Sequence, residues 1–375
     1  MVATIGLGIS EATETREREA GAEEYRACRR NPSRRHQSWL AHAGNRSQLG
    51  LWILGLAVRR HGLARGLLRF LSRIPRMQAL ARAAIRKLDR LAGASEAAGG
   101  WSELKAFFWQ TLPILVYHHV GPYIPGTFRF LTIEPAAFAR QLGWLYQKGF
   151  TAIHVRAWID WLDRGDALPK KPIVLTFDDA YADIAQYALP ELRSRGMQAT
   201  VYVVTGPTGG TNSWDLQYVR RAHSLMGEEE IRSWSHNDIE VGCHTRSHRR
   251  LVNLDPAELE IEVRGSADEL ASVADGAGES FAYPYGAYDR AALEHVSAVF
   301  RSAVTTCPGT NKLWTPRHQL RRANVDPRHE WFDFPFLVRF GWGPYESLHV
   351  SLARKKKALL DKVCNLIRAL RPYVL

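Results

Sequence analysis

Cysteine is scarce in this chain of 375 residues, which contains four. The four cysteines lie far apart and form no CxxC pair; they are Cys28, Cys243, Cys307 and Cys364. This spacing argues against a zinc ribbon and against a small secreted module stapled by disulfides. A reducing compartment is therefore favoured.

Long apolar segments are also missing. The longest apolar run, LGLWILGLAV near Leu49 to Val58, is about half the length that a helix needs to span a bilayer. The N-terminus lacks the pattern of a secretory signal, because the apolar residues of MVATIGLGIS precede a group of acidic residues and follow no basic region. These absences predict a cytoplasmic protein without a transmembrane helix.

Acidic residues are nearly absent from one region only. Residues 26 to 90 hold sixteen Lys and Arg against the single acid Asp89, whereas residues 91 to 375 carry +1 of the total net charge of +12. A nucleic-acid-binding protein is expected to concentrate its basic charge on the domain that binds. The body of this protein is nearly neutral, so no nucleic-acid partner is expected.

The charge pattern divides the chain into four parts. Residues 1–48 are expected to be disordered, since they contain few large apolar side chains. Residues 49–105 form a basic amphipathic helical extension and a linker, and the helical part, 49–92, is suited to peripheral contact with an anionic membrane. The alternatives are a helix packed on the main domain or a start codon assigned upstream of the true one. The main domain is expected at 106–330, followed by a C-terminal extension with a second basic helix at 331–375.

The main domain alternates short β-branched runs with helical stretches. This alternation predicts parallel strands joined by crossover helices, and a barrel is the natural closure of such a sheet. The expected strands are Ile114–His118, Ala152–Val155, Ile173–Phe177, Thr200–Val204, Glu240–Cys243, Phe281–Tyr283, Ser302–Thr305 and Leu320–Val325. The expected helices are Pro135–Gln147, Ile184–Arg195, Pro256–Val273 and Arg290–Val299.

Two adjacent carboxylates, Asp178 and Asp179, come directly after an expected apolar strand in the segment PIVLTFDDAY. Neighbouring acids at a strand end repel each other, and a bound cation makes such a pair favourable. The alternative is a turn in which one Asp caps the next helix.

Two histidines, His244 and His248, follow another expected strand in the segment GCHTRSH. Their spacing of four predicts that one helical turn brings both imidazoles to one side. The HExxH pattern of zinc proteases is absent. Together with one carboxylate, the two histidines can form a facial triad that leaves positions open for water and substrate.

Two further segments, FAYPYG at 281–286 and LVYHHV at 115–120, complete a recognisable order. TFDD, then HTxxH about 65 residues later, then a PYG turn about 35 residues after that, resembles the polysaccharide deacetylase family, also called the NodB-homology domain. The resemblance covers about residues 110 to 330 and implies a distorted (β/α) barrel. Barrel enzymes carry their chemistry at the carboxyl ends of the strands, where all four motifs are expected to lie.

The resemblance implies a role for each motif residue. Asp178 would be the general base, and Asp179, His244 and His248 would hold a divalent metal; zinc matches these ligands, and cobalt or nickel is also suitable. The backbone N–H of Tyr285 would donate to the oxyanion. The expected reaction is the removal of N-acetyl groups from an N-acetylated sugar in a polysaccharide or a lipid-linked glycan.

The sequence departs from the common family pattern in two places. The usual Leu-x-x-His motif that supplies the general acid is missing from QLRRANV at 319–325. The YHHV segment instead resembles the circularly permuted branch, in which an early Tyr-His supplies the acid. This assigns the acid to His118, with His119 and then His318 as alternatives.

The second departure concerns the arginine that often orients the base in this family. It is replaced here by Ala282. Arg322, from a neighbouring strand, is the candidate to take its place.

Two other functions stay open. One is hydrolysis of a different non-peptide C–N bond, such as a ring amide of a small molecule, on the same fold. The other is an inactive domain that binds sugar.

Overall fold

The computed structural model describes residues 110–235, 239–274, 276–327 and 333–343. The predictions for residues 1–48, for the extension at 49–105 and for the C-terminal basic helix fall outside these ranges. Within the described residues, no helix has the length and apolar character needed to cross a membrane.

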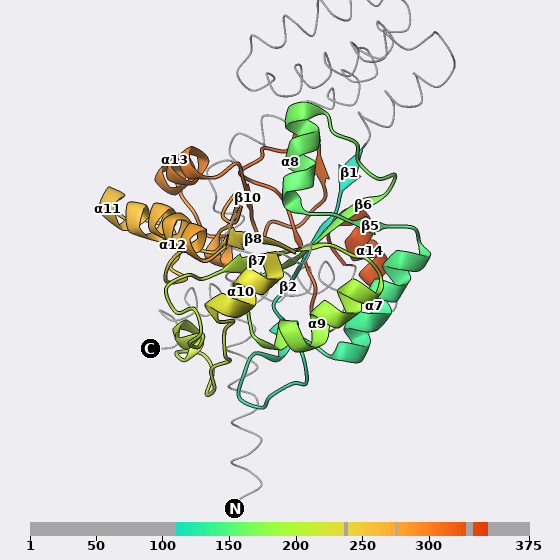
Figure 1. Cartoon of the computed structure of the whole chain (residues 1–375), viewed down its shortest axis with the longest axis horizontal. Coiled ribbons are helices and arrows are strands. Elements are labelled where there is room, and N and C mark those ends of the chain that lie inside the picture. The colour runs from blue at the N-terminus through green and yellow to red at the C-terminus, as the bar shows by residue number, and fades with distance from the viewer. Residues whose placement is uncertain (1–109, 236–238, 275, 328–332, 344–375) are drawn as a thin grey trace, which may run out of the picture.

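One parallel sheet forms the centre of the body (Figure 1). Its strand order is β10-β9-β8-β7-β6-β2-β12, with β5 paired to β6. The paired strands all run parallel. The strands are β2 Ile114–Tyr117, β5 Thr151–Ala152, β6 Pro172–Phe177, β7 Ala199–Val203, β8 Ile239–Cys243, β9 Ser280–Ala282, β10 Ser302–Val304 and β12 Ala323–Asn324. Their order along the sheet confirms the predicted α/β fold with parallel strands.

The sheet curls into an incomplete barrel. Its edge strands are β10 and β12, and an isolated parallel bridge between Val304 and Leu320 links β10 to the segment that leads into β12. Two small sheets lie outside it. The strands of these small sheets are β1 Thr111–Leu112 with β11 Asn311–Lys312, and β3 His119–Val120 with β4 Thr132–Ile133.

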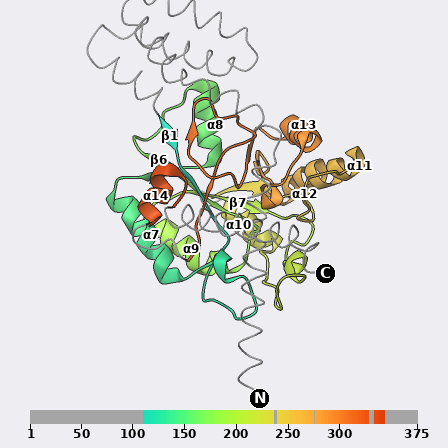
Figure 2. The ribbon, with the colours of Figure 1, turned by 180° about the vertical axis from the view of Figure 1, so that it is seen from behind.

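Helices surround the sheet, with α11, α12 and α13 on one side and α7, α9 and α14 on the other (Figures 1 and 2). The α-helices are α7 Pro135–Gln147, α8 Val155–Arg164, α9 Asp183–Ser194, α10 Glu228–Ser235, α11 Pro256–Leu259, α12 Gly265–Val273, α13 Arg290–Val299 and α14 Asp333–Phe340. Capping side chains fix where two of these helices begin. Asp255 and Glu258 form a capping box before α11, and Asp289 caps α13 through the Ala292 N–H.

The predicted helices at 135–147 and 290–299 have the predicted bounds. The predicted helix at 256–273 is interrupted by a π-turn over Glu260–Arg264, which separates α11 from α12. The predicted strand Ala152–Val155 is wrong at its end, because Val155 begins α8 and buries Trp158, Ile159 and Leu162 at helical spacing.

The main core continues past residue 330. Phe334, Leu337 and Val338 of α14 are buried in the same apolar cluster as the barrel strands. The ring of Phe334 also packs edge-on against Trp144 of α7. Helix α14 therefore belongs to the body of the domain.

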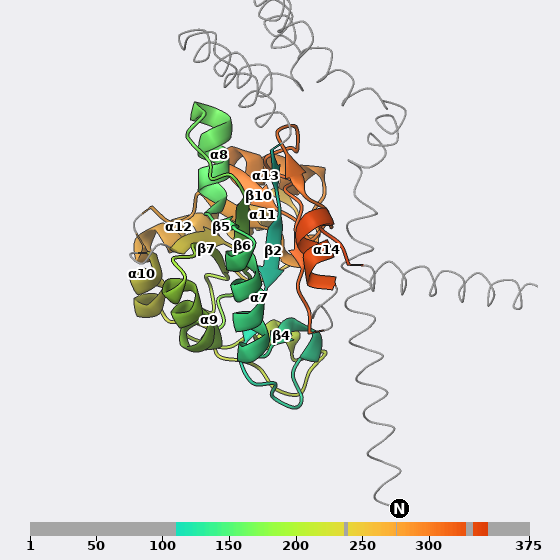
Figure 3. The ribbon, with the colours of Figure 1, turned by 90° about the vertical axis from the view of Figure 1, so that its right-hand side faces the viewer.

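The carboxyl ends of the parallel strands face one end of the body. In Figure 3 the chain runs from the end near α8 along β2 toward the segment that carries β4. Because the other strands of the sheet run parallel to β2, their carboxyl ends open on the β4 end. The loops that follow the strands meet there.

Two of the four cysteines, Cys243 and Cys307, lie in the described residues. Cys307 is disulfide-bonded, whereas Cys243 is a buried free thiol.

Candidate metal and active site

The two acidic residues that follow β6, Asp178 and Asp179, have side chains with different partners. Asp179 and Ala180 adopt left-handed backbone conformations, with φ values of 70° and 54°. Such conformations are uncommon for residues with a Cβ and are found at functional turns. Both carboxylates are buried, yet they have different partners. Asp179 meets two histidines and Asp178 meets an arginine.

Asp179, His244 and His248 form a group that we name the Asp179 cluster. Oδ1 of Asp179 lies 3.2 Å from Nε2 of His248 and 3.5 Å from Nε2 of His244. Nδ1 of His244 lies 2.7 Å from the carbonyl oxygen of Ala282. A carbonyl can only accept, so this Nδ1 carries the proton and Nε2 keeps its lone pair toward Asp179.

The donor set of the Asp179 cluster fits a divalent transition metal. Burial is the largest cause that lowers the pKa of His244 and of His248, so both imidazoles favour the neutral form that binds metals. One carboxylate and two imidazoles leave coordination positions for other ligands. Zinc, cobalt and nickel all match this donor set.

The turn that carries the two histidines differs from the predicted helical turn. Residues 244–248 form no helix, and Thr245 and His248 have left-handed φ values of 66° and 61°. The His248 N–H donates to the Thr245 hydroxyl at 2.9 Å, and Glu262 accepts from the N–H groups of Arg246 and Ser247. These bonds close a tight turn that still brings the two rings together, with centroids 5.0 Å apart.

Arg322 is the partner of Asp178. Nη1 and Nη2 of this buried arginine donate to the two carboxylate oxygens of Asp178, each at 2.6 Å. Its Nε donates to the carbonyl of Thr305 at 3.0 Å, and Nη1 also reaches the hydroxyl of Thr176 at 3.1 Å. A guanidinium fork fixed at several points holds a carboxylate in one orientation.

The charge state of Asp178 follows from this pairing. Burial alone raises the pKa of Asp178, but the charge of Arg322, the field of His244 and the hydrogen bonds from Arg322 outweigh it and lower the pKa to about 2. Asp178 is therefore a carboxylate at neutral pH. The contact required for Arg322 to orient Asp178 is present.

His118 follows β2 and lines the same cavity as Asp178 and His244. Burial lowers its pKa to about 4, against the opposing effect of the Asp178 charge. The imidazole is therefore neutral at neutral pH. It can act as an acid only after it has received a proton.

The two alternative acids point elsewhere. Nδ1 of His119 lies 2.8 Å from Asp183, and Nε2 of His318 lies 2.8 Å from the carbonyl of Phe300. Neither residue is among those that line the cavity. Of the three candidate histidines, the fold brings His118 to Asp178.

The PYG turn contributes Tyr285, which has a left-handed φ of 56° and lines the cavity. Its ring packs edge-on against His248 and beneath the guanidinium of Arg250, 4.1 Å from the ring centroid. Gly286 follows with a φ of 62°, and a Cβ there would lie 2.1 Å from the Thr306 hydroxyl. The turn therefore requires glycine at this position.

The sequence motifs did not reveal the rest of the cavity wall. These lining residues come from the segments after β3, β7, β8 and β10; they are Phe128, Phe130, Leu131, Asp215, Tyr218, Arg250 and Thr306. Trp214 stacks on His248 with ring centroids 4.6 Å apart, next to Asp215. No spacing pattern in the sequence marks these positions.

The fold is an incomplete parallel barrel. At its carboxyl end, two imidazoles and a carboxylate lie next to an aspartate that an arginine holds. This arrangement is typical of a metal-binding hydrolase site. Comparison with known proteins agrees with this class. Residues 165–299 match the family model described as polysaccharide deacetylase. The chain is 25% identical over 217 residues to YxkH of Bacillus subtilis, which carries the name of a polysaccharide deacetylase; the match covers 58% of this chain and 72% of that protein.

More distant similarities extend the comparison. Poly-beta-1,6-N-acetyl-D-glucosamine N-deacetylase of Staphylococcus aureus is 22% identical over 198 residues, which cover 50% of this chain and 67% of that one. Among solved structures, Streptococcus pyogenes deacetylase PplD in complex with acetate superposes with a TM-score of 0.54 at 22% identity and covers 62% of this chain and 98% of its own. That superposition confirms the fold.

The match of residues 165–299 to the polysaccharide deacetylase model agrees with the family resemblance that the motifs carried. The relatives named above are deacetylases by name, and the one from Staphylococcus aureus is named for N-deacetylation. The resemblance to the circularly permuted branch stays a prediction.

Proposed function

We propose that this protein is a metal-dependent N-deacetylase that acts on an N-acetylated sugar in a polysaccharide or a lipid-linked glycan. One observation carries the proposal. Asp178, fixed by Arg322, lies beside the Asp179 cluster in a cavity that His118 also lines. A base, a metal-binding group and an acid are the parts that amide hydrolysis needs.

Asp179, His244 and His248 would hold the metal. When bound, such a metal supplies Lewis-acid polarisation of the acetyl carbonyl and a more acidic water. Asp178 accepts the proton of the attacking water as its oxygen adds to the carbonyl carbon. Arg322 keeps the carboxylate in place during this step, because its guanidinium is anchored on Thr305 and Thr176.

The backbone N–H of Tyr285 donates to the oxyanion that forms on the former carbonyl oxygen. His118 takes up a proton from solvent and passes it to the sugar nitrogen as the C–N bond breaks, and Asp178 later returns to solvent the proton that it took from the water. The pKa of His118, lowered to about 4, makes it a ready donor once it is protonated. The products are acetate and a free amino sugar.

The substrate class rests on the relatives. The Staphylococcus aureus relative is named for deacetylation of a β-1,6-linked N-acetylglucosamine polymer. The cavity wall of this chain combines aromatic side chains with Asp215 and Arg250, which suits a sugar ring with its hydroxyl groups.

The test is acetate release from a panel of N-acetylated glycans and lipid-linked sugars, with the metal removed by chelation and added back. We expect acetate release from at least one substrate. This release should stop on chelation and return when zinc or cobalt is added. Acetate release that continues after full chelation contradicts the proposed mechanism.

A further inference from the structure

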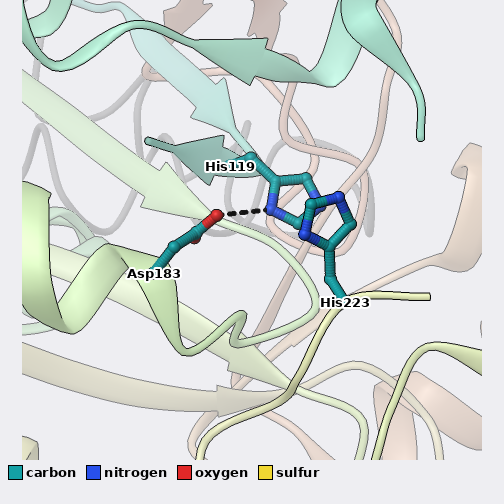
Figure 4. A group of neighbouring side chains, drawn as sticks. All are labelled: His119, Asp183 and His223. Atoms are coloured by element: carbon teal, nitrogen blue, oxygen red, sulfur yellow. Dashed lines mark hydrogen bonds and ion pairs between the residues drawn. The ribbon is translucent and has the colours of Figure 1, made fainter. Parts of the chain in front are cut away.

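A second set of metal-binding side chains lies outside the catalytic cavity. His119 of β3, Asp183 at the start of α9 and His223 between β7 and α10 converge from three segments (Figure 4). One potential ligand atom from each lies within 4.8 Å of the others. We name this group the His119 cluster. None of its members lines the cavity that contains the Asp179 cluster.

The contacts within the His119 cluster are close. Nδ1 of His119 lies 2.8 Å from Oδ2 of Asp183, and the ring centroids of His119 and His223 are 3.6 Å apart. Figure 4 shows the carboxylate turned toward the His119 ring, with the His223 ring beside it. The cluster thus brings together two imidazoles and a carboxylate, which is a donor set that binds divalent transition metals.

Two buried atoms of the His119 cluster have no hydrogen-bond partner within the described part of the chain. They are Oδ1 of Asp183 and Nε2 of His223. A buried polar atom without a partner is costly, and a bound cation offers a partner where the protein supplies none.

We propose that His119, Asp183 and His223 bind a second divalent transition metal with a structural role. His223 pairs with Asn212 through main-chain and side-chain hydrogen bonds, and Asn212 donates to Asp215 at 2.8 Å. Asp215 lines the catalytic cavity. A metal on His223 therefore anchors the segment that forms one wall of the cavity onto β3 and α9.

The alternative to a metal site is a cluster of aromatic rings that pack together for structural reasons. His119 also stacks on Tyr181, with centroids 3.6 Å apart and an angle of 28° between the rings. In that case the His119–Asp183 hydrogen bond is structural and no metal is held. Metal content separates the two cases, and it does so without any measurement of deacetylation.

The experiment is a zinc count on the full chain. The purified protein is stripped with a chelator, loaded with Zn²⁺, dialysed, and assayed for zinc per chain. Two zinc ions are expected for the wild type, one for His223→Ala and one for Asp183→Asn. His295→Ala, which changes a histidine of α13 that belongs to neither cluster, should keep two. Circular dichroism checks folding, and the near-isosteric Asp183→Asn decides if His223→Ala does not fold.

The catalytic-cluster variant His244→Ala separates this proposal from the proposed function. The His244→Ala variant is expected to bind one zinc per chain. The double variant His244→Ala/His223→Ala is expected to bind none. The second site alone is overturned if the wild type binds one zinc, if His244→Ala loses it, and if both His223→Ala and Asp183→Asn keep it. A single zinc that is lost in His223→Ala but stays in His244→Ala supports the second site and overturns the metal assignment of the first.

Discussion

The Asp179 cluster and the His119 cluster offer the same donors, one carboxylate and two imidazoles, in different surroundings. The Asp179 cluster is buried at the carboxyl ends of the strands and shares its cavity with Asp178 and His118. The His119 cluster lies outside that cavity, and the ring of Tyr181 stacks on His119. The comparison teaches that a ligand set identifies a metal site, whereas the base and acid beside it identify an enzyme.

The two clusters also differ in how their ligands are held. The protonated nitrogen of His244 is fixed by the carbonyl of Ala282, and the turn that carries His248 is fixed by Thr245. In the His119 cluster the ligands bond mainly to one another, through His119 and Asp183. Ligands fixed by outer partners are set up for catalytic geometry, so function should depend on the first cluster far more than on the second.

The largest expected effect is loss of the catalytic metal. His244→Ala should lower acetate release by about 10³-fold or more, since several kcal/mol of transition-state stabilisation come from the metal. His223→Ala, its counterpart in the other cluster, should stay within about tenfold of the wild type in kcat. Equal losses from both variants would remove the distinction between the clusters.

The next effect concerns the acid. His118→Asn should lower kcat by about 10²- to 10⁴-fold, because proton donation to the leaving amine is lost. His318→Asn is the matched control, since His318 bonds to the Phe300 carbonyl. Steady-state kinetics with both variants checks this. If His318→Asn were the damaging change and His118→Asn harmless, the acid would be misassigned.

Arg322 tests whether the base is oriented. Arg322→Met should destabilise the protein by about 3–5 kcal/mol, because Asp178 would remain buried without a partner. In Arg322→Met/Asp178→Asn, which removes the orphaned charge, most of that stability should return. Urea denaturation of the single and double variants measures the coupling. Strictly additive losses would show that the pair is not coupled.

The smallest effect is a pH dependence of stability from Asp215. Burial, against the hydrogen bond from Asn212, raises the pKa of Asp215 to about 6, above its ordinary value of 3.8. The folded state therefore binds more protons than the unfolded state between these two values, and stability falls as the pH rises through this window. Asp215→Asn should flatten that fall, by about 2 kcal/mol in all.

Unfolding curves of the wild type and of Asp215→Asn at pH 4, 5, 6 and 7 make the Asp215 comparison. Parallel curves for the two proteins would mean that Asp215 does not titrate in this range.

Much of the fold was predictable because the strands are apolar runs separated by helical periods. Helices α7 and α13 were predictable with their bounds because each has a recognisable start, Pro135 at the first position of α7 and the N-cap Asp289 before α13. Helix α8 was missed although its apolar residues recur at helical spacing, because the preceding β-branched residues were read as a longer strand. The π-turn inside 256–273 left no mark on the apolar pattern.

The catalytic motifs were predictable because Asp178, Asp179, His244 and His248 form short local patterns at strand ends. The partners from distant segments were harder to find. Arg322 lies 144 residues from Asp178 and was proposed only to fill a gap. The His119 cluster could not be predicted, since its members come from three separate segments and share no spacing.

The most direct test of the central claim is acetate release by Asp178→Asn on the substrate that the wild type deacetylates, with zinc content measured in the same samples. The account predicts that the variant binds as much zinc as the wild type and releases acetate about 10²- to 10⁴-fold more slowly, because the base is lost while the metal ligands stay. Wild-type acetate release by a zinc-loaded Asp178→Asn protein would contradict it.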